Sequence, residues 1–199
     1  MSAGIEKTLV ETPNFTNPAI LLHPNIPKPM HGVTPRTIMG QEWWDEQRQR
    51  AYEENNFCCW ACGVHKSKAM FHKWLEAHEC YEIDYIAGRI HLKEIAALCH
   101  ACHNFIHSGR MDMMVRQGQM LERKMNSIVA HGNRIKKAAK LSYTDFPLWL
   151  SKTLESMRQS DVHNQFAAWE DWRMVINDVE YPPVHRSFEE WREFYARKS

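Results

Sequence analysis

The sequence predicts an α+β fold, and three observations point to it. Two Cys-x-x-Cys pairs, Cys59/Cys62 and Cys99/Cys102, bracket a central segment of the 199-residue chain. Within that segment, residues 74–93 alternate apolar and polar side chains, a period that is typical of strands. Directly after the second pair, the spacing changes to that of a helix. Strands followed by a helix, with cysteines at the junction, predict a core that a bound metal ion cross-links.

The cysteine spacing is that of a structural zinc site. Two knuckles with four thiolates supply the tetrahedral ligands that Zn²⁺ prefers. Six cysteines could also form disulfides in a secreted chain, but the paired spacing and the lack of an export signal favour reduced, metal-bound thiolates. We therefore expect Cys59, Cys62, Cys99 and Cys102 to hold one structural zinc ion. Cys58 and Cys80 are expected to be ordinary buried thiols.

Composition and charge limit the class of protein. A hydrophobic content of 44% and a charged content of 25% are ordinary for a globular protein. No apolar run reaches the roughly 18 residues of a membrane span, and the N-terminus lacks the plan of a signal peptide, so we expect a soluble cytoplasmic protein. With a net charge of +1, contact with nucleic acid requires a local basic patch rather than an overall positive charge.

Residues 110–140 provide the best candidate for such a patch. They carry eight cationic side chains against few acidic ones: Arg110, Arg116, Arg123, Lys124, Arg134, Lys136, Lys137 and Lys140. These residues either contact phosphates or form the solvated face of a helix.

By composition the chain divides into three parts. Residues 1–40 carry six of the nine prolines and are predicted to be an extended N-terminal arm, whose Ile20-Leu21-Leu22 patch packs on its own core or on a second subunit. Residues 41–117 are predicted to hold a helix at 41–55, both knuckles and the metal-binding domain. Residues 118–199 are predicted to be mainly helical, with a helix near 146–158, a small hairpin around Asn177-Asp178 and a last helix capped by Ser187.

The central segment reads as a hairpin followed by a helix. Tyr81 and Ile83 alternate with acidic residues, and Ala87-Gly88 supplies a turn before the second strand. In the helix that follows, His103 and His107 are four residues apart and share one face. A hairpin and a helix with a zinc knuckle at their junction form a ββα-metal unit.

Three segments of this unit also resemble a known family. They are Cys59-Trp-Ala-Cys62-Gly, Leu75-Glu-Ala-His78-Glu79 and Leu98-Cys99-His-Ala-Cys102-His103-Asn-Phe-Ile-His107. Together they resemble the zinc-containing HNH endonucleases over about residues 56–110, and the wider stretch is similar to uncharacterised HNH-like proteins of bacteriophages. A phage-encoded protein would work in the cytoplasm of the host cell.

The resemblance implies a metal-dependent DNA endonuclease that hydrolyses phosphodiester bonds. It implies one catalytic divalent cation, such as Mg²⁺, Mn²⁺, Ni²⁺ or Zn²⁺, in addition to the structural zinc. By position, His78 corresponds to the first strand histidine, a metal ligand, and Glu79 to the general base. His107 corresponds to the opposing ligand on the helix, and His103 either supports it or ligates alongside. DNA is the implied partner, and a homodimer would supply two active sites for duplex cleavage.

The sequence departs from the family pattern at the base. Glu79 stands where a histidine is usual, and a carboxyl group with a pKa of about 4.3 is a weaker base at neutral pH than an imidazole near 6.5. Glu79 is therefore a slower base, an extra metal ligand or a sign of lost catalysis. In an alternative register His78 is the base and Glu76 orients it. Glu94 also replaces a common asparagine.

These departures support a second hypothesis. In it, the chain is a catalytically inactive HNH-like zinc protein that binds DNA or a host protein, as an accessory or counter-defence factor.

Overall fold

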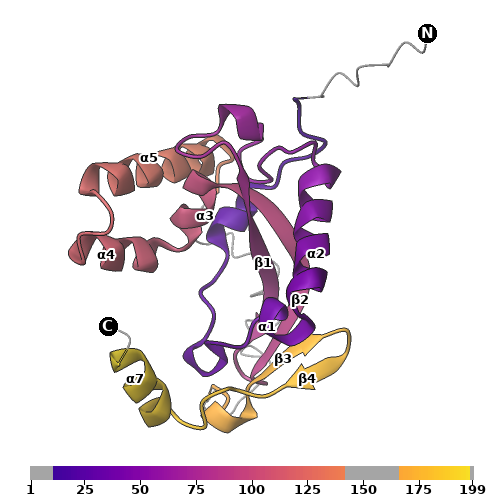
Figure 1. Ribbon diagram of the computed structural model, residues 1–199, viewed down its shortest axis with the longest axis vertical. Coiled ribbons are helices and arrows are strands. Elements are labelled where there is room, and N and C mark those ends of the chain that lie inside the picture. Colours follow the sequence, from indigo (N-terminus) through magenta and orange to yellow (C-terminus); the bar gives the residue numbers. More distant parts are fainter. Residues whose placement is uncertain (1–10, 142–165, 198–199) are drawn as a thin grey trace. The chain divides into compact units, whose positions relative to one another are not determined.

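The computed structural model describes residues 11–141 and 166–197, and within them the protein is α+β, as predicted (Figure 1). The described α-helices are α1 (Pro35–Met39), α2 (Gln41–Glu54), α3 (His100–Ile106), α4 (Ser108–Arg116), α5 (Glu122–Ala138) and α7 (Phe188–Ala196). The strands are β1 (Leu75–Asp84), β2 (Arg89–Cys99), β3 (Arg173–Ile176) and β4 (Val179–Tyr181). The predicted helix near 146–158 lies outside the described residues.

The chain forms two compact units, each assembled from separate segments. Among the described residues, unit 1 contains 11–21, 48–78 and 96–139, and unit 2 contains 22–47, 79–95, 140–141 and 166–197. These bounds differ from the division at residues 40 and 117 that composition suggested. Composition describes stretches that are continuous in sequence, whereas a compact unit contains segments that are close in space. The predicted division into arm, metal domain and helical region stays a prediction.

The sheet has the order β1-β2-β3-β4. Residues 85–88 form the tight turn between β1 and β2, as predicted, and Asp84 stabilises it by accepting hydrogen bonds from the backbone N–H groups of Ile86 (2.9 Å) and Ala87 (3.0 Å). Gly88 has a φ of +66°, and a Cβ there would lie 2.7 Å from the Cβ of Ala167, so both the turn and its packing require glycine.

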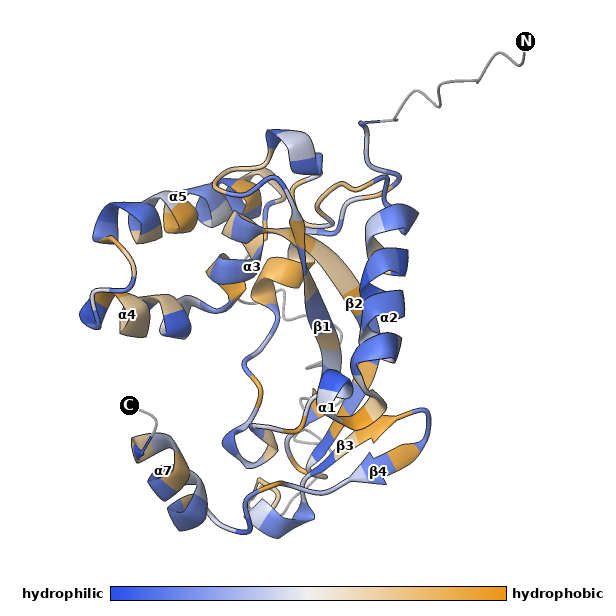
Figure 2. Cartoon of the chain, viewed as in Figure 1, coloured by the Kyte–Doolittle hydropathy of each residue, from blue (hydrophilic) through white to orange (hydrophobic). Residues whose placement is uncertain are grey.

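The small hairpin predicted around Asn177-Asp178 is present, formed by β3 and β4, and it extends the sheet. Asn177 and Asp178 both have positive φ, 49° and 63°, as a two-residue hairpin turn requires. β3 pairs in parallel with β2, with Ile90 opposite Met174. Figure 2 shows β3 as mostly hydrophobic and α2 as mostly hydrophilic. The pairing places β3 over the core of unit 2, which consists of Met30, Val33, Tyr81, Ile83, Ile90, Trp172, Met174 and Ile176.

The predicted N-terminal arm packs on its own chain. Ile20 and Leu21 lie in a short 3₁₀ helix, Pro18–Leu22, and are buried, so the first of the two expected placements holds for them. Further 3₁₀ turns lie at Lys28–Met30, Lys66–Lys68 and Trp169–Asp171.

The last helix begins as predicted at Ser187, whose side chain accepts from the N–H of Glu190 (3.3 Å). Trp191 faces the 3₁₀ turn at Lys28–Met30, with its indole N–H 3.2 Å from His31 Nδ1 and Lys28 Nζ 5.1 Å from its ring.

α3 and α5 of unit 1 pack closely against each other. A Cβ on the buried Gly132 of α5 would lie 2.2 Å from the ring of Phe105 in α3. This close approach sets the position of α3, the helix that carries His100, Cys102 and His103 among the candidate ligands described below. None of the described helices combines the length and the hydrophobicity needed to cross a membrane.

A buried histidine completes the hydrogen bonding of β1. His23 is 7% exposed, and its Nε2 accepts from the backbone N–H of Tyr81 at 2.8 Å. Burial lowers the pKa of His23 to about 4. The folded protein therefore keeps this ring neutral at pH values where the unfolded chain protonates it.

We expect the free energy of unfolding to fall as the pH decreases from about 6.5 to about 4, because the unfolded state then binds the additional proton. His23→Gln keeps an acceptor but does not titrate, so its loss of stability between pH 7 and pH 4.5 should be smaller by about 2 kcal/mol. Urea unfolding at the two pH values measures this, with His91→Ala as the control. An identical loss in His23→Gln and the wild type would contradict it.

Candidate metal centre

The two cysteine pairs come together in unit 1. One sulfur atom from each of Cys59, Cys62, Cys99 and Cys102 lies within 4.8 Å of the others. Cys62 Sγ and Cys99 Sγ are 3.9 Å apart, close to the roughly 3.8 Å between sulfurs of a tetrahedral ion with Zn–S bonds of about 2.3 Å. Cys58 and Cys80 are buried outside this group, as predicted. The four cysteines can therefore bind a metal such as zinc.

The first knuckle is a tight turn between Cys59 and Val64. The Cys59 N–H donates to Val64 O (2.9 Å), and the Gly63 N–H donates to Cys59 O (2.8 Å). Gly63 has a φ of +72°, which favours glycine in this turn. The Trp60 N–H donates to Ala97 O (2.8 Å), so the knuckle is hydrogen-bonded directly to the end of β2, two residues before Cys99.

The second knuckle is the beginning of α3. Cys99 is the N-cap residue with extended backbone angles, and Cys102 lies in the first turn. The free N–H groups and positive dipole end of a helix N-terminus stabilise negative charge, so this position favours thiolates.

Protons are divided unequally among the four thiols. Hydrogen bonds from Cys102 and Cys59 lower the pKa of Cys62 to about 6, and the same two partners lower that of Cys99. Burial raises the pKa of Cys59. Part of the cluster is therefore deprotonated near neutral pH, the form in which sulfur binds metal.

His131 of α5 is a partner of this cluster that the sequence did not reveal. His131 Nε2 lies 3.6 Å from Cys102 Sγ, and hydrogen bonds to Cys62 and Cys99 raise the pKa of His131 to about 9, so the ring can donate to the cluster. An N–H donated to a thiolate orients the ligand and reduces its charge. His131 lies far from both knuckles in sequence and has no motif of its own, so only the packing of α5 on α3 could identify it.

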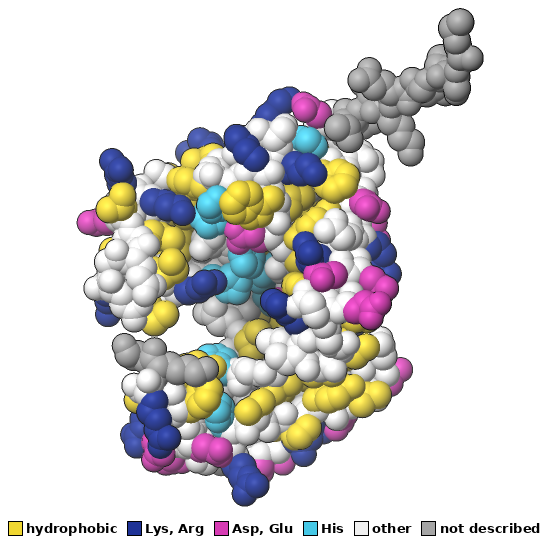
Figure 3. Space-filling model, viewed as in Figure 1, with side chains coloured by type: hydrophobic (Ala, Val, Ile, Leu, Met, Phe, Trp, Pro, Cys, Tyr) yellow, Lys and Arg dark blue, Asp and Glu magenta, His cyan; other side chains and the backbone are white. Residues whose placement is uncertain are grey.

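The predicted histidines also come together. His78 of β1 is buried, and one ring nitrogen from each of His78, His103 and His107 lies within 4.8 Å of the others. The ring centroids are 5.2 Å apart for His78 and His107 and 4.8 Å apart for His103 and His107. A tetrahedral ion with bonds of about 2.0–2.1 Å needs nitrogens about 3.4 Å apart, so the three rings would have to move closer together to hold one. In Figure 3, histidine side chains are exposed on the surface near the position of α3.

Glu76 binds two histidines of α3 rather than one of the strand. Its carboxylate accepts from His103 Nδ1 (2.5 Å) and from His100 Nδ1 (2.6 Å). Burial alone would raise the pKa of Glu76, but these two hydrogen bonds outweigh it and lower the pKa to about 2. An ionised carboxylate only accepts, so both Nδ1 atoms carry a proton, and Nε2 is the atom of each ring that could bind a metal ion.

The two other acidic residues lie elsewhere on the strands. Glu79 directly follows His78 on β1, so the alternation of the strand turns its side chain to the opposite face. Glu94 is exposed on β2. His65, in the loop after the first knuckle, is 6% exposed and accepts from the N–H of Ser67 (3.3 Å).

His100 was not identified from the sequence, although its spacing of three residues before His103 is a signal that both rings could face β1.

No family model, no curated protein and no solved structure matches this chain.

Cys62→Ser and Cys99→Ser should each lose one equivalent of zinc and unfold unit 1 at a lower temperature, because metal binding and folding of such knuckles are one equilibrium. Zinc content by elemental analysis and thermal melting test this. Cys80→Ala, which removes a buried thiol outside the cluster, should keep its zinc. Unchanged zinc content in either serine variant would refute the assignment.

His131→Ala should weaken zinc binding by roughly 10- to 100-fold, the usual effect of removing a hydrogen-bonding partner of a metal ligand. Competition with a chromogenic chelator measures the affinity. Asn133→Ala, an exposed position on the same helix, is the matched control. Equal affinities for the two variants would remove His131 from the site.

Proposed function

We propose that the chain is a metal-dependent DNA endonuclease of the HNH type, which hydrolyses phosphodiester bonds, and that its four-cysteine cluster holds a structural zinc ion. One observation carries the proposal: imidazoles from a strand and from the helix after the hairpin, His78, His103 and His107, converge within 4.8 Å. His103 lies on the helix whose first turn completes the cysteine cluster, and His107 is the C-cap residue of that helix. Structural and reactive metal sites are then built on the same short element.

The three imidazoles would hold one divalent cation. Such an ion, when bound, supplies positive charge to a phosphate oxygen and to the leaving oxygen. The chain's own contribution is to orient the rings. Glu76 fixes the proton of His103 on Nδ1 and so leaves Nε2 as the ligand atom, the arrangement commonly found behind metal-binding histidines.

A cavity beside Glu76 carries cationic side chains that suit a phosphate backbone. Arg110 of α4 and Lys124 of α5 line a cavity together with Glu76 and His100. Arg116 and Arg123 are exposed on the same two helices, although Arg116 also pairs with Asp112 at 2.7 Å. We infer that these helices contact DNA phosphates, which would make binding strongly dependent on salt.

Two residues are candidates for the proton acceptor of the attacking water, Glu79 and His78. The resemblance assigns it to Glu79, whereas the alternation of β1 turns Glu79 away from the His78 face. This observation favours either His78 as the base or the second candidate function. In that second function the chain binds DNA or a host protein through the same zinc-stapled scaffold and cleaves nothing.

The enzyme proposal predicts that the full chain relaxes or linearises supercoiled plasmid with at least one of Mg²⁺, Mn²⁺, Ni²⁺ or Zn²⁺. His78→Ala and His107→Ala should lower the rate by at least about 100-fold, because each removes a ligand or base from the centre. Gel quantification of nicked and linear DNA gives the rates. His91→Ala, on β2 outside the metal groups, should cleave like the wild type.

Glu79→Gln distinguishes the two bases. Full activity in this variant would remove Glu79 from the reaction, and a loss comparable to that of His78→Ala would establish it as the base. If the wild type is inert with every metal but still retards DNA or binds a host protein, the second function holds and the endonuclease proposal fails.

A further inference from the structure

A second group of metal-binding side chains lies beside the histidines of the proposed centre. One ligand atom from each of His72, Glu76 and His100 lies within 4.8 Å of the others. The rings of His72 and His100 meet edge to face with centroids 4.2 Å apart. Glu76 Oε1 accepts from His100 Nδ1 at 2.6 Å, and a carboxylate that accepts such bonds keeps further lone pairs for a metal ion.

The loop before β1 is held in an unusual conformation that presents His72 to this group. Phe71 has a φ of +69°, which is uncommon for a bulky residue and usually persists only where surrounding contacts enforce it. Those contacts are visible here: the Phe71 ring packs edge to face on His100 (5.6 Å), and Lys124 Nζ lies 5.1 Å from it. Trp74 stacks on the His72 ring at 4.2 Å.

The donor set has a defined metal preference. Two imidazoles and one carboxylate are the protein ligands of many catalytic zinc sites, which keep a further position for water or substrate. Nitrogen and oxygen donors of this kind select divalent transition ions rather than Ca²⁺. The set shares no ligand with the cysteine cluster and shares none with His78, His103 and His107.

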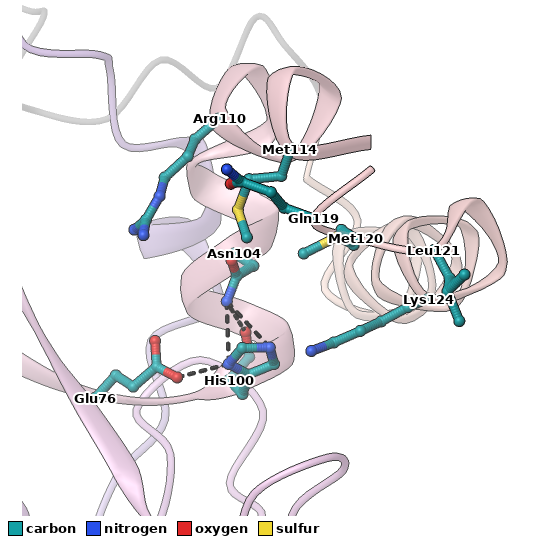
Figure 4. A pocket seen from close by; sticks show the side chains of 9 residues that line it. All are labelled: Glu76, His100, Asn104, Arg110, Met114, Gln119, Met120, Leu121 and Lys124. Atoms are coloured by element: carbon teal, nitrogen blue, oxygen red, sulfur yellow. Dashed lines mark hydrogen bonds and ion pairs between the residues drawn. The ribbon is translucent and has the colours of Figure 1, made fainter. Parts of the chain in front are cut away.

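The group opens onto a cavity. Glu76 and His100 line a space of about 430 Å³ whose other walls include Arg110, Met114 and Lys124. Figure 4 shows Lys124 of α5 extending toward the His100 ring, with Glu76 on another side of that ring. An ion here would be accessible from the cavity, and the two cationic side chains would favour an anionic ligand beside it.

We propose that His72, Glu76 and His100 form a second, exchangeable site for a divalent transition-metal ion of the Zn²⁺ type. Glu76 links it to the first histidine group, because its other carboxylate oxygen binds His103. The inference stands on this geometry and does not require nuclease activity.

The test counts ions by calorimetric titration of Zn²⁺ into the full chain, after a weak chelator has removed all zinc except that of the cysteine cluster. The wild type should take up two further equivalents. His72→Ala should take up one, and the double variant His72→Ala/His107→Ala none, with unchanged thermal melting of the zinc-loaded protein. His91→Ala, the matched control, should take up two.

The outcomes separate this inference from the proposed function. One equivalent in His107→Ala that disappears on adding His72→Ala supports the second site whether or not DNA is cut. The wild type could instead take up a single equivalent, which is lost in His72→Ala but kept in His107→Ala. That result supports the second site and contradicts the proposal that His78, His103 and His107 hold a catalytic cation. Equal stoichiometry and affinity in His72→Ala and the wild type would overturn the second site.

Discussion

The convergence of two cysteine pairs is the constraint on which unit 1 depends. One pair is a turn that is hydrogen-bonded to the end of β2 through Trp60 and Ala97, and the other is the N-terminal turn of α3. A cation shared by four sulfurs would convert the separate segments into one body and neutralise thiolates that burial would otherwise disfavour. The positions of His103 and His107 then follow from that of α3, because His103 lies on this helix and His107 is its C-cap residue, at the break before α4.

Glu76 couples the groups around α3. A carboxylate that accepts from both His100 and His103 holds two rings in one tautomer and directs their remaining nitrogens to different neighbours. This single side chain therefore contacts both histidine groups. It also explains why β1 matters to the site: Glu76 and His78 are two residues apart on one strand and so face the same way.

The sequence predicted those features that depend on near neighbours. The alternating pattern predicted that Tyr81 and Ile83 are buried, and both are. The Asn177-Asp178 pair predicted a hairpin, and both residues have the positive φ of its turn. Ser187 was predicted to cap the last helix, and it does. The sequence did not predict the parallel pairing of β3 with β2, which joins residues more than 80 positions apart through backbone atoms that every residue type possesses. Nor did it reveal His131, which contacts Cys102 only because Gly132 lets α5 approach Phe105.

Residue types and short spacings by themselves identified most of the candidate metal ligands of this chain. Pairs of cysteines three residues apart and histidines four residues apart orient donor atoms through local backbone geometry, and local geometry is encoded by adjacent residues. Only the tertiary structure decided which donors share a centre. His72, Glu76 and His100 come from a loop, a strand and a helix, and their convergence depends on packing and long-range hydrogen bonds that no local pattern records.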